Sequence, residues 1–339
     1  MNRTALALGT AVLTVVPATA VGAPRVTTLF TIQDPGITES SGLVDQGANV
    51  LTIEDSGDGP TVYVLDSATG ETVGRTTYST DAVVDVEAVA RGRKGVVWVG
   101  DIGDNDAVRP NISVYRVGRV GPGDRTVSAQ RYDLVYPGGP RDAETLLVDP
   151  DDGRLYVVSK GLFGGQLFRA PRTLSSDEVN VLRPVGRVGG LVTDGEFMPD
   201  GTHVVLRDYS EAFVYATGPW REVGSWALPS QPQGEGISLR PSGKRVIVSS
   251  EGDQQPVLSV RIPARLLDMV QPRGASPSAS GPSGDGSTAA DGRASGSSSP
   301  DIIGVVGLAT VGLAAALGLR AVVRRASLRS SRPRSRSTR

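Results

Sequence analysis

Carboxylate side chains recur along this chain at spacings that could assemble a site for chemistry. A glutamate opens five similar short phrases: Glu39 (ESSGL), Glu87 (EAVA), Glu144 (ETLL), Glu196 (EFMPDG) and Glu235 (EGISL). An aspartate stands two residues before three of these glutamates, at Asp85, Asp142 and Asp194. Because residues i and i+2 of a strand face the same side, each such pair would place two carboxylates together.

A second set of acidic residues follows the next apolar run of most units. It comprises Glu54 with Asp55, Asp101 with Asp104, Asp208, and Glu251 with Asp253, whereas the third unit has Ser159 and Lys160 at this place. Carboxylates gathered in one place cannot all ionise without raised pKa values, basic partners or a bound cation. In a chain without cysteine and with one histidine, oxygen ligands of this kind favour Ca²⁺ over zinc or copper.

The sequence therefore gives a set of candidate cation ligands and leaves a structural use of the same residues open. The structural alternative is that the glutamates cap backbone amides or pair with Arg141, Arg207 or Lys160. The loop from Asp101 to Asp106 is the densest acidic cluster, but it lacks the complete twelve-residue calcium pattern. The candidate ligands are Glu39, Glu87, Glu144, Glu196, Glu235, Asp85, Asp142, Asp101, Asp104 and Asp208.

No residue is assigned a catalytic role from the sequence. His203 is the single histidine, and it lies in an apolar strand with nothing nearby that would complete a Ser-His-Asp triad. The chain has no G-x-S-x-G nucleophile motif and no cysteine, so thiol nucleophiles, Cys-based metal sites and disulfides are excluded.

The elements that must position the carboxylates are short strands. After each glutamate come a turn, a strongly apolar strand such as GVVWV or KRVIV, a polar loop, a third strand and a more polar fourth strand. Five such units, 39 to 57 residues apart, predict an all-β fold, a propeller of five four-stranded blades. The last unit lacks a fourth strand, and residues 26–32 form a strand before the first glutamate, so we expect that strand to complete the last blade. A sixth, degenerate blade and a β-sandwich remain the alternatives.

The two ends of the chain have compositions unlike the repeats. Residues 1–23 are typical of a secretory signal peptide, and residues 24–270 form the expected ectodomain. Residues 271–300, rich in Ser, Gly and Pro, indicate a disordered stalk. The uncharged run at 302–319 predicts a single transmembrane helix over residues 301–319, and the eight arginines of residues 320–339 predict a basic cytoplasmic tail.

The net charge of the chain indicates which kinds of macromolecule it can bind. The formal charge of the whole chain is −1, but without the eight tail arginines and Arg3, 26 basic residues face 36 acidic ones, a charge of −10. A domain this acidic is a poor partner for phosphate backbones, so we expect no nucleic-acid binding.

The chain resembles secreted bacterial β-propeller domains in its DVEAVA stretch at 85–90, its E-[SA]-[SV]-[GA] starts and its strand order across residues 26–265. Among such domains, it is similar to the WD40-like and phytase-like groups. Together with the Ala/Val/Arg/Gly-rich composition and the tail, the chain resembles actinobacterial surface proteins. Phytase-like propellers are six-bladed calcium enzymes with a basic phosphate pocket, and this chain has an acidic channel and three lysines. Calcium-centred propeller lactonases and esterases use a mixed Glu/Asn/Asp site, which implies Glu39, Glu87, Glu144, Asn105 and Asp208 here.

These observations lead to two expected functions. The first is a propeller anchored at the cell surface, in the cell membrane, that binds an extracellular protein, glycan or small molecule, with a cation at an acidic central channel. The second is a calcium-dependent hydrolase, of the phosphoesterase, esterase or lactonase type, that acts at the channel mouth.

Overall fold

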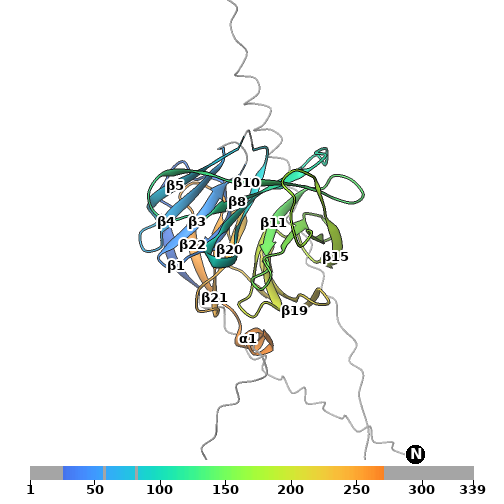
Figure 1. Ribbon diagram of the computed structural model, residues 1–339. Helices are drawn as coiled ribbons and strands as arrows, with labels where there is room; N and C mark the ends of the chain where they lie inside the picture. The colour runs from blue at the N-terminus through green and yellow to red at the C-terminus, as the bar shows by residue number, and fades with distance from the viewer. Residues whose placement is uncertain (1–25, 56–58, 81–82, 271–339) are drawn as a thin grey trace, which may run out of the picture. The chain divides into compact units, whose positions relative to one another are not determined.

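The computed structural model describes residues 26–55, 59–80 and 83–270, all within one compact unit. These residues form five mainly antiparallel sheets that stand around a common axis as the blades of a propeller (Figure 1). The expected five blades are thereby confirmed, and the sixth blade and the β-sandwich are not found in this part of the chain.

Each blade follows the repeat recognised in the sequence. Blade 1 comprises β2 (Ser40–Asp45), β3 (Asn49–Glu54), β4 (Thr61–Asp66) and β5 (Thr72–Ser79). Blade 2 comprises β6 (Val86–Arg91), β7 (Val97–Asp101), β8 (Ile112–Gly118) and β10 (Gln130–Val135). Blade 3 comprises β11 (Ala143–Val148), β12 (Leu155–Ser159), β13 (Gly165–Arg169) and β15 (Arg183–Val188). Blade 4 comprises β16 (Asp194–Phe197), β17 (His203–Arg207), β18 (Glu211–Ala216) and β19 (Arg221–Ala227).

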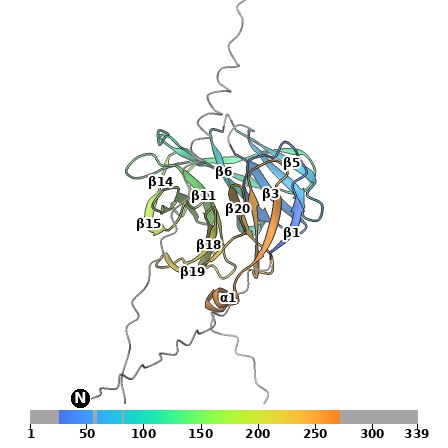
Figure 2. The same ribbon diagram turned by 180° about the vertical axis from the view of Figure 1, so that it is seen from behind.

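The N-terminal strand closes the ring in blade 5, as expected. This blade comprises β20 (Gly234–Leu239), β21 (Arg245–Ser250), β22 (Pro256–Arg261) and, on its outer edge, β1 (Val26–Thr31). Strand β1 pairs antiparallel with β22, with Val26 opposite Val260 and Thr31 opposite Pro256. Figure 2 shows β1 beside the orange strands of the last blade. Closure removes two sheet edges that a linear array would leave exposed.

The core lies between the blades, not inside them. Five clusters of buried apolar side chains each join two neighbouring blades, and the fifth joins blade 5 to blade 1 through Phe30, Leu43 and Ile247. The inner strands β2, β11 and β20 are buried at every position because other blades flank them on both sides. The outer strand β5 alternates buried and exposed residues, as a strand with one solvated face does.

Two short strands cross from one blade to the next and were not expected from the sequence. Strand β9 (Arg125–Ser128) pairs parallel with β5 of blade 1, although its chain belongs to the second repeat. Strand β14 (Asn180–Val181) pairs parallel with β10 of blade 2 from within the third repeat. The extra length of the second repeat therefore extends a neighbouring sheet.

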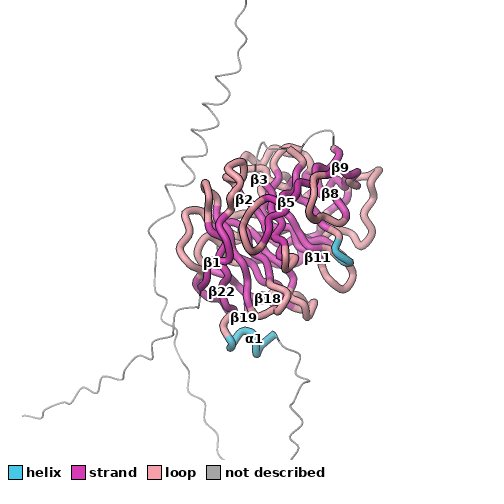
Figure 3. The backbone as a smooth tube through the Cα atoms, turned by 90° about the vertical axis from the view of Figure 1, so that its left-hand side faces the viewer, coloured by secondary structure: helices cyan, strands magenta, loops and turns pink. Residues whose placement is uncertain are grey.

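Among the described residues, helical structure is confined to two short segments, coloured cyan in Figure 3: the 3₁₀ turn η1 (Arg93–Gly95) and the helix α1 (Ala264–Val270). Leu266 and Val270 of α1 pack into the core between blades 4 and 5. No helix in the described ranges is long and apolar enough to cross a membrane. The expected signal peptide, stalk, membrane span at 301–319 and basic tail lie outside the described residues.

Candidate metal centre

The inner strands bring three of the five repeat glutamates to one end of the propeller axis, here called the acidic end. Glu87, Glu144 and Glu235 are the second residues of β6, β11 and β20, and each is only 2% exposed. In all three blades, the register between the inner strand and the second strand of the blade shifts at this glutamate. A bulge at the start of an inner strand thus gives these three carboxylates the same place in their blades.

Glu39 and Glu196 do not share this place. Glu39 lies one residue before β2, where Ser41 occupies the second position. In β16 the second residue is Gly195, so Glu196 comes one residue later. Glu196 reaches the other end of the axis, where it pairs with Arg91 and accepts a hydrogen bond from the backbone N–H of Leu239 at 2.7 Å. Since consecutive strand residues point to opposite faces of the sheet, a shift of one position turns Glu196 to the face opposite the one used by Glu87, Glu144 and Glu235.

Three carboxylates at the acidic end lie close enough to share one cation. Asp55 directly follows β3 of blade 1, Asp85 directly precedes β6 of blade 2, and Glu87 is the second residue of β6. One carboxylate oxygen from each lies within 4.8 Å of the other two, and all three residues are buried. Oxygen Oε1 of Glu87 accepts no hydrogen bond within the described part of the chain. The Asp85/Glu87 pair was expected from its i, i+2 spacing, whereas Asp55 was not among the candidate ligands.

The loop after β7 covers this cluster. The backbone of Gly103 packs so closely that a Cβ placed there would lie 2.5 Å from Oδ2 of Asp85 and 2.8 Å from Cγ of Glu87. The N–H of Gly103 donates to the carbonyl oxygen of Asp85 at 3.1 Å. A glycine is therefore required where the loop meets the carboxylates.

The candidate ligands Asp101, Asp104 and Asp142 shape this loop. Asp101 accepts the N–H of Asp85 at 2.9 Å and forms an ion pair with Arg109 at 2.8 Å. Asp104 accepts the N–H groups of Val108 and Arg109, both at 2.9 Å, and donates its own N–H to Asp142 at 2.9 Å. In the structure these three carboxylates bind protein groups.

A second group of charges lies beside the cluster. Lys160 forms an ion pair with Glu144, and its Nζ lies 5.8 Å from the ring centre of Tyr209. Burial by itself would lower the pKa of Lys160, but the Glu144 carboxylate raises it above the ordinary value. Burial also raises the pKa of Tyr209 to about 12, and the Glu235 and Glu144 carboxylates act in the same direction. Lys160 is thus held charged among acids.

Burial dominates the protonation of the two remaining glutamates. It raises the pKa of Glu87 well above the ordinary value, and the neighbouring carboxylates of Glu144, Asp55 and Asp85 raise it further, against the opposing effect of Lys160. Burial and Glu144 likewise raise the pKa of Glu235. The charges of Lys160 and of the buried Arg207 guanidinium, which interacts with Glu235, are fewer than the buried carboxylates here, so protons or a further cation must compensate the rest.

Two buried residues outside the list of candidate ligands, Asp194 and Arg207, fix the inner strands around the centre. Asp194 accepts the N–H groups of Ile237 at 2.8 Å and Leu43 at 3.2 Å, which joins blade 4 to blades 5 and 1. Arg207 is fully buried and donates to the carbonyl oxygens of Gly236 at 3.1 Å and Ser249 at 3.2 Å. Their charges could have been read from the sequence, but the partners are backbone groups with no signature.

The remaining candidates lie at the edge of the acidic end. Asp208 accepts the N–H groups of Ser210 at 2.8 Å and Glu211 at 2.7 Å, and so closes a turn. Glu39 donates its backbone N–H to Glu54 at 2.8 Å. His203 lies at the start of β17 and bonds Asp200 through Nδ1 at 2.7 Å, away from any nucleophile–base arrangement in the described residues.

The cluster of Asp55, Asp85 and Glu87 fits a hard divalent cation. Its donors are carboxylate oxygens, which Ca²⁺ prefers, and a buried oxygen without a hydrogen-bond partner is a place where a cation can bind.

Comparison with known proteins assigns neither a family nor an activity to this chain. No protein-family model matches the chain. No curated protein matches it either. A gluconolactonase from Xanthomonas campestris is 16% identical, with a TM-score of 0.42 over 72% of this chain and 91% of that one. A proposed oxidoreductase (glucose dehydrogenase) from Thermus thermophilus is 13% identical, with a TM-score of 0.42 over 70% of this chain and 100% of that one. At these values the likeness assigns no substrate to this chain.

Proposed function

We propose that this protein is a calcium-dependent hydrolase whose cation is held by Asp55, Asp85 and Glu87 at the acidic end of the propeller. The observation that carries the proposal is the convergence of these three buried carboxylates from two blades within 4.8 Å. When bound, Ca²⁺ would supply a Lewis acid that polarises a carbonyl or phosphoryl oxygen. An ester or lactone suits the centre better than a phosphate ester, since Lys160 is the cation beside it and is paired with Glu144.

The residues around the cluster support proton transfer. Glu144 and Glu235 are buried, and burial together with the Glu144 carboxylate raises the pKa of Glu235, so its carboxyl group holds a proton more readily than an exposed one. Lys160 offers N–H donors to a developing negative charge next to them. Two carboxylates with different environments beside one lysine are a suitable arrangement for general acid and general base roles.

The experiment is a calcium titration of the purified full-length chain, followed by thermal unfolding. A ligand that binds only the native state stabilises it by about 2.7 kcal/mol at 100 times its Kd, so we expect Tm to rise by about 5–10 °C. Glu87→Gln should abolish the rise and the calcium-dependent hydrolysis of short esters and lactones. Glu71→Gln, at an exposed outer turn, is the matched control and should keep both. An unchanged Tm in wild-type protein would remove the calcium centre.

A second candidate function is binding of a partner at the same end. Val84, Val108, Leu162 and Phe163 are 62%, 71%, 63% and 96% exposed, and all lie in loops at the acidic end. Exposed apolar tips on loops of neighbouring blades favour contact with a protein, a glycan or an apolar substrate group. The binding role is tested by adding the purified protein to cells of the organism that produces it and measuring how much stays bound. If Leu162→Ser/Phe163→Ser abolishes this binding while Glu87→Gln does not, the binding role is supported over the hydrolase.

The cellular setting of this proposal depends on segments outside the described residues. A cleaved signal peptide, the stalk, the membrane span at 301–319 and the arginine tail would place the propeller outside the cell on a membrane anchor. Protease treatment of intact cells tests this topology, because only an external propeller would be released from its tail.

A further inference from the structure

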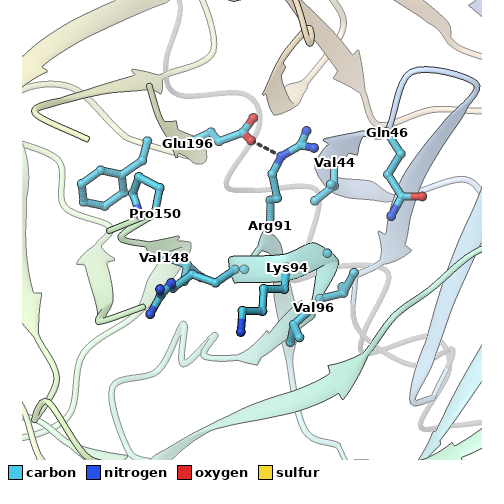
Figure 4. A pocket seen from close by; sticks show the side chains of 13 residues that line it. Val44, Gln46, Arg91, Lys94, Val96, Val148, Pro150 and Glu196 are labelled. Carbon is cyan, nitrogen blue, oxygen red and sulfur yellow. Dashed lines mark hydrogen bonds and ion pairs between the residues drawn. The ribbon is translucent and has the colours of Figure 1, made fainter. Parts of the chain in front are cut away.

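A cavity of about 540 Å³ lies at the end of the axis opposite the carboxylate cluster, where the inner strands finish. Four blades line it, with Val44 and Gln46 from blade 1, Arg91 and Lys94 from blade 2, Pro150 from blade 3 and Glu196 from blade 4 (Figure 4). Its volume is in the range of small-molecule sites in proteins. We call it the axial pocket.

A rigid ion pair forms one side of the axial pocket. Nε of Arg91 donates to Oε1 of Glu196 at 2.7 Å, as the dashed line in Figure 4 marks, and the guanidinium also donates to the carbonyl oxygen of Asp45. The other oxygen of Glu196 accepts Oγ of Ser238 and N of Leu239, both at 2.7 Å. Both charges are therefore neutralised and fixed before any ligand enters.

The turn after β6 leaves a positive charge in the pocket. Arg93 and Lys94 both line it, and neither forms an ion pair among the described residues. Glu196 is the single carboxylate among the lining residues, and Arg91 already pairs with it. Lys94 adopts φ 56°, a left-handed conformation that is uncommon for lysine. Two cations without a partner make the pocket attractive to an anion.

Apolar side chains form much of the remaining wall: Val44, Val96, Val97, Val148, Pro150 and Phe197. We propose that the axial pocket binds a small organic carboxylate, with its anionic group at Arg93 and Lys94 and its apolar body against this wall. A neutral apolar compound would leave the two cations without a partner, and a bare inorganic anion would leave the wall uncovered. The site stands apart from the proposed calcium centre in position and in the charge it selects.

A second basic cavity provides the competing explanation for anion binding. Arg154, Arg169, Arg172 and Arg183 line a cavity of about 440 Å³ on blade 3, and Arg169 lies directly opposite Arg183 on the neighbouring strand. Asp152 lies near two of the four, 3.7 Å from Arg154 and 3.6 Å from Arg172. Because the wall there has fewer apolar residues, this cavity should accept inorganic phosphate as readily as an organic acid.

The test is calorimetric titration of the full-length chain with hexanoate, hexan-1-ol and inorganic phosphate as separate probes. Arg93→Gln/Lys94→Gln keeps the side-chain stems and should weaken hexanoate binding by about tenfold or more. Lys244→Ala, an exposed lysine in the corresponding turn of blade 5 that does not line the pocket, is the matched control and should change binding by less than twofold. Hexanol should bind at least tenfold more weakly than hexanoate.

Each contrary result overturns the proposal. The first two are that hexanoate does not bind at millimolar concentration, or that hexanol binds as tightly as hexanoate. The third is that the double variant and Lys244→Ala lose the same amount of hexanoate affinity. The fourth is that Arg183→Ala loses hexanoate affinity while the double variant keeps it. Glu87→Gln should bind hexanoate as the wild type does, so failure of the calcium centre leaves this result unaffected.

Discussion

Single residues at the acidic end show how burial converts an ordinary carboxylate into a binding group. Glu87, with one oxygen unbonded, and Glu144, paired with Lys160, occupy the same strand position in neighbouring blades. Their different partners give them different roles, because a buried charge is stable only with a compensating group nearby. The repeat therefore supplies positions, and the local partners decide the chemistry.

Removing Lys160 should be costly because it leaves Glu144 without its cation. We expect Lys160→Met to lower the free energy of unfolding by about 3–5 kcal/mol in calcium-free urea denaturation. The double variant Lys160→Met/Glu144→Gln should recover a substantial part, since no uncompensated charge stays buried. Equal losses in the single and double variants would show that the ion pair is not the cause.

Asp194 should make stability fall as pH rises. Burial raises its pKa to about 8 from an ordinary value of 3.8, although three backbone N–H donors oppose the shift. Between these values the folded state keeps a proton that the unfolded state loses, so the stabilisation is complete below about pH 4 and is lost by about pH 8. Urea midpoints at pH 5 to 8, measured with EDTA, should show this decline, and Asp194→Asn should flatten it. An identical slope in the variant would contradict the assignment.

Gly103 provides a residue-level test of the calcium centre that leaves every ligand in place. A Cβ at this position would conflict with the side chains of Asp85 and Glu87, so Gly103→Ala should weaken calcium binding by about tenfold or more. Calcium titration by calorimetry measures the change. Gly121→Ala, where a Cβ meets nothing within 4 Å, is the matched control and should leave the affinity unchanged.

At the scale of strands and loops, sequence patterns predicted the elements better than their exact register. Most apolar runs rich in Val and Ile became the second and third strands of the blades, because they are buried between blades whatever their precise pairing. The position of Glu196 could not be predicted, since a one-residue shift in β16 leaves its phrase looking like the others. Strand β9 is short and largely exposed, and β14 has only two residues, so no hydrophobic pattern marks either strand.

The candidate site was predicted in part for the same reason. The i, i+2 spacing of Asp85 and Glu87 is a local property, and the structure places both in the carboxylate cluster. Asp55 joins them across a blade interface, which depends on packing that no spacing along the chain reveals. The axial pocket gave no sequence signal, because its lining comes from four blades.

Strand β1 should contribute to stability through its one deeply buried side chain. Phe30 is 5% exposed and packs into the cluster that joins blades 5 and 1, so Phe30→Ala should cost about 3–5 kcal/mol in urea unfolding. Val26 lies in the same strand but is 38% exposed, and Val26→Ala should cost less than about 0.5 kcal/mol. Similar costs for both would mean that β1 does not complete the last blade as a packed strand.

At the scale of the whole molecule, neighbouring blades all pack through similar apolar interfaces. A bound cation would stabilise one of these interfaces more than the others. Asp55 belongs to blade 1, whereas Asp85 and Glu87 belong to blade 2, so a bound cation would connect these two blades and no others. We expect calcium to slow amide hydrogen exchange in β3 and β6 more than in β13 and β18. Uniform slowing across all blades would argue against a cation at this interface.

The pairing of β1 with β22 imposes an order on assembly. Val26 and Val260 are partners, so the first described strand has no edge to join until nearly the whole propeller has been synthesised. Contacts between segments so distant in sequence make folding slow, because the entropy of closing the chain must be lost before the contact is gained. Until β22 has been made, β1 has no strand of the propeller to pair with, so the ring can close only when the last strand of blade 5 folds.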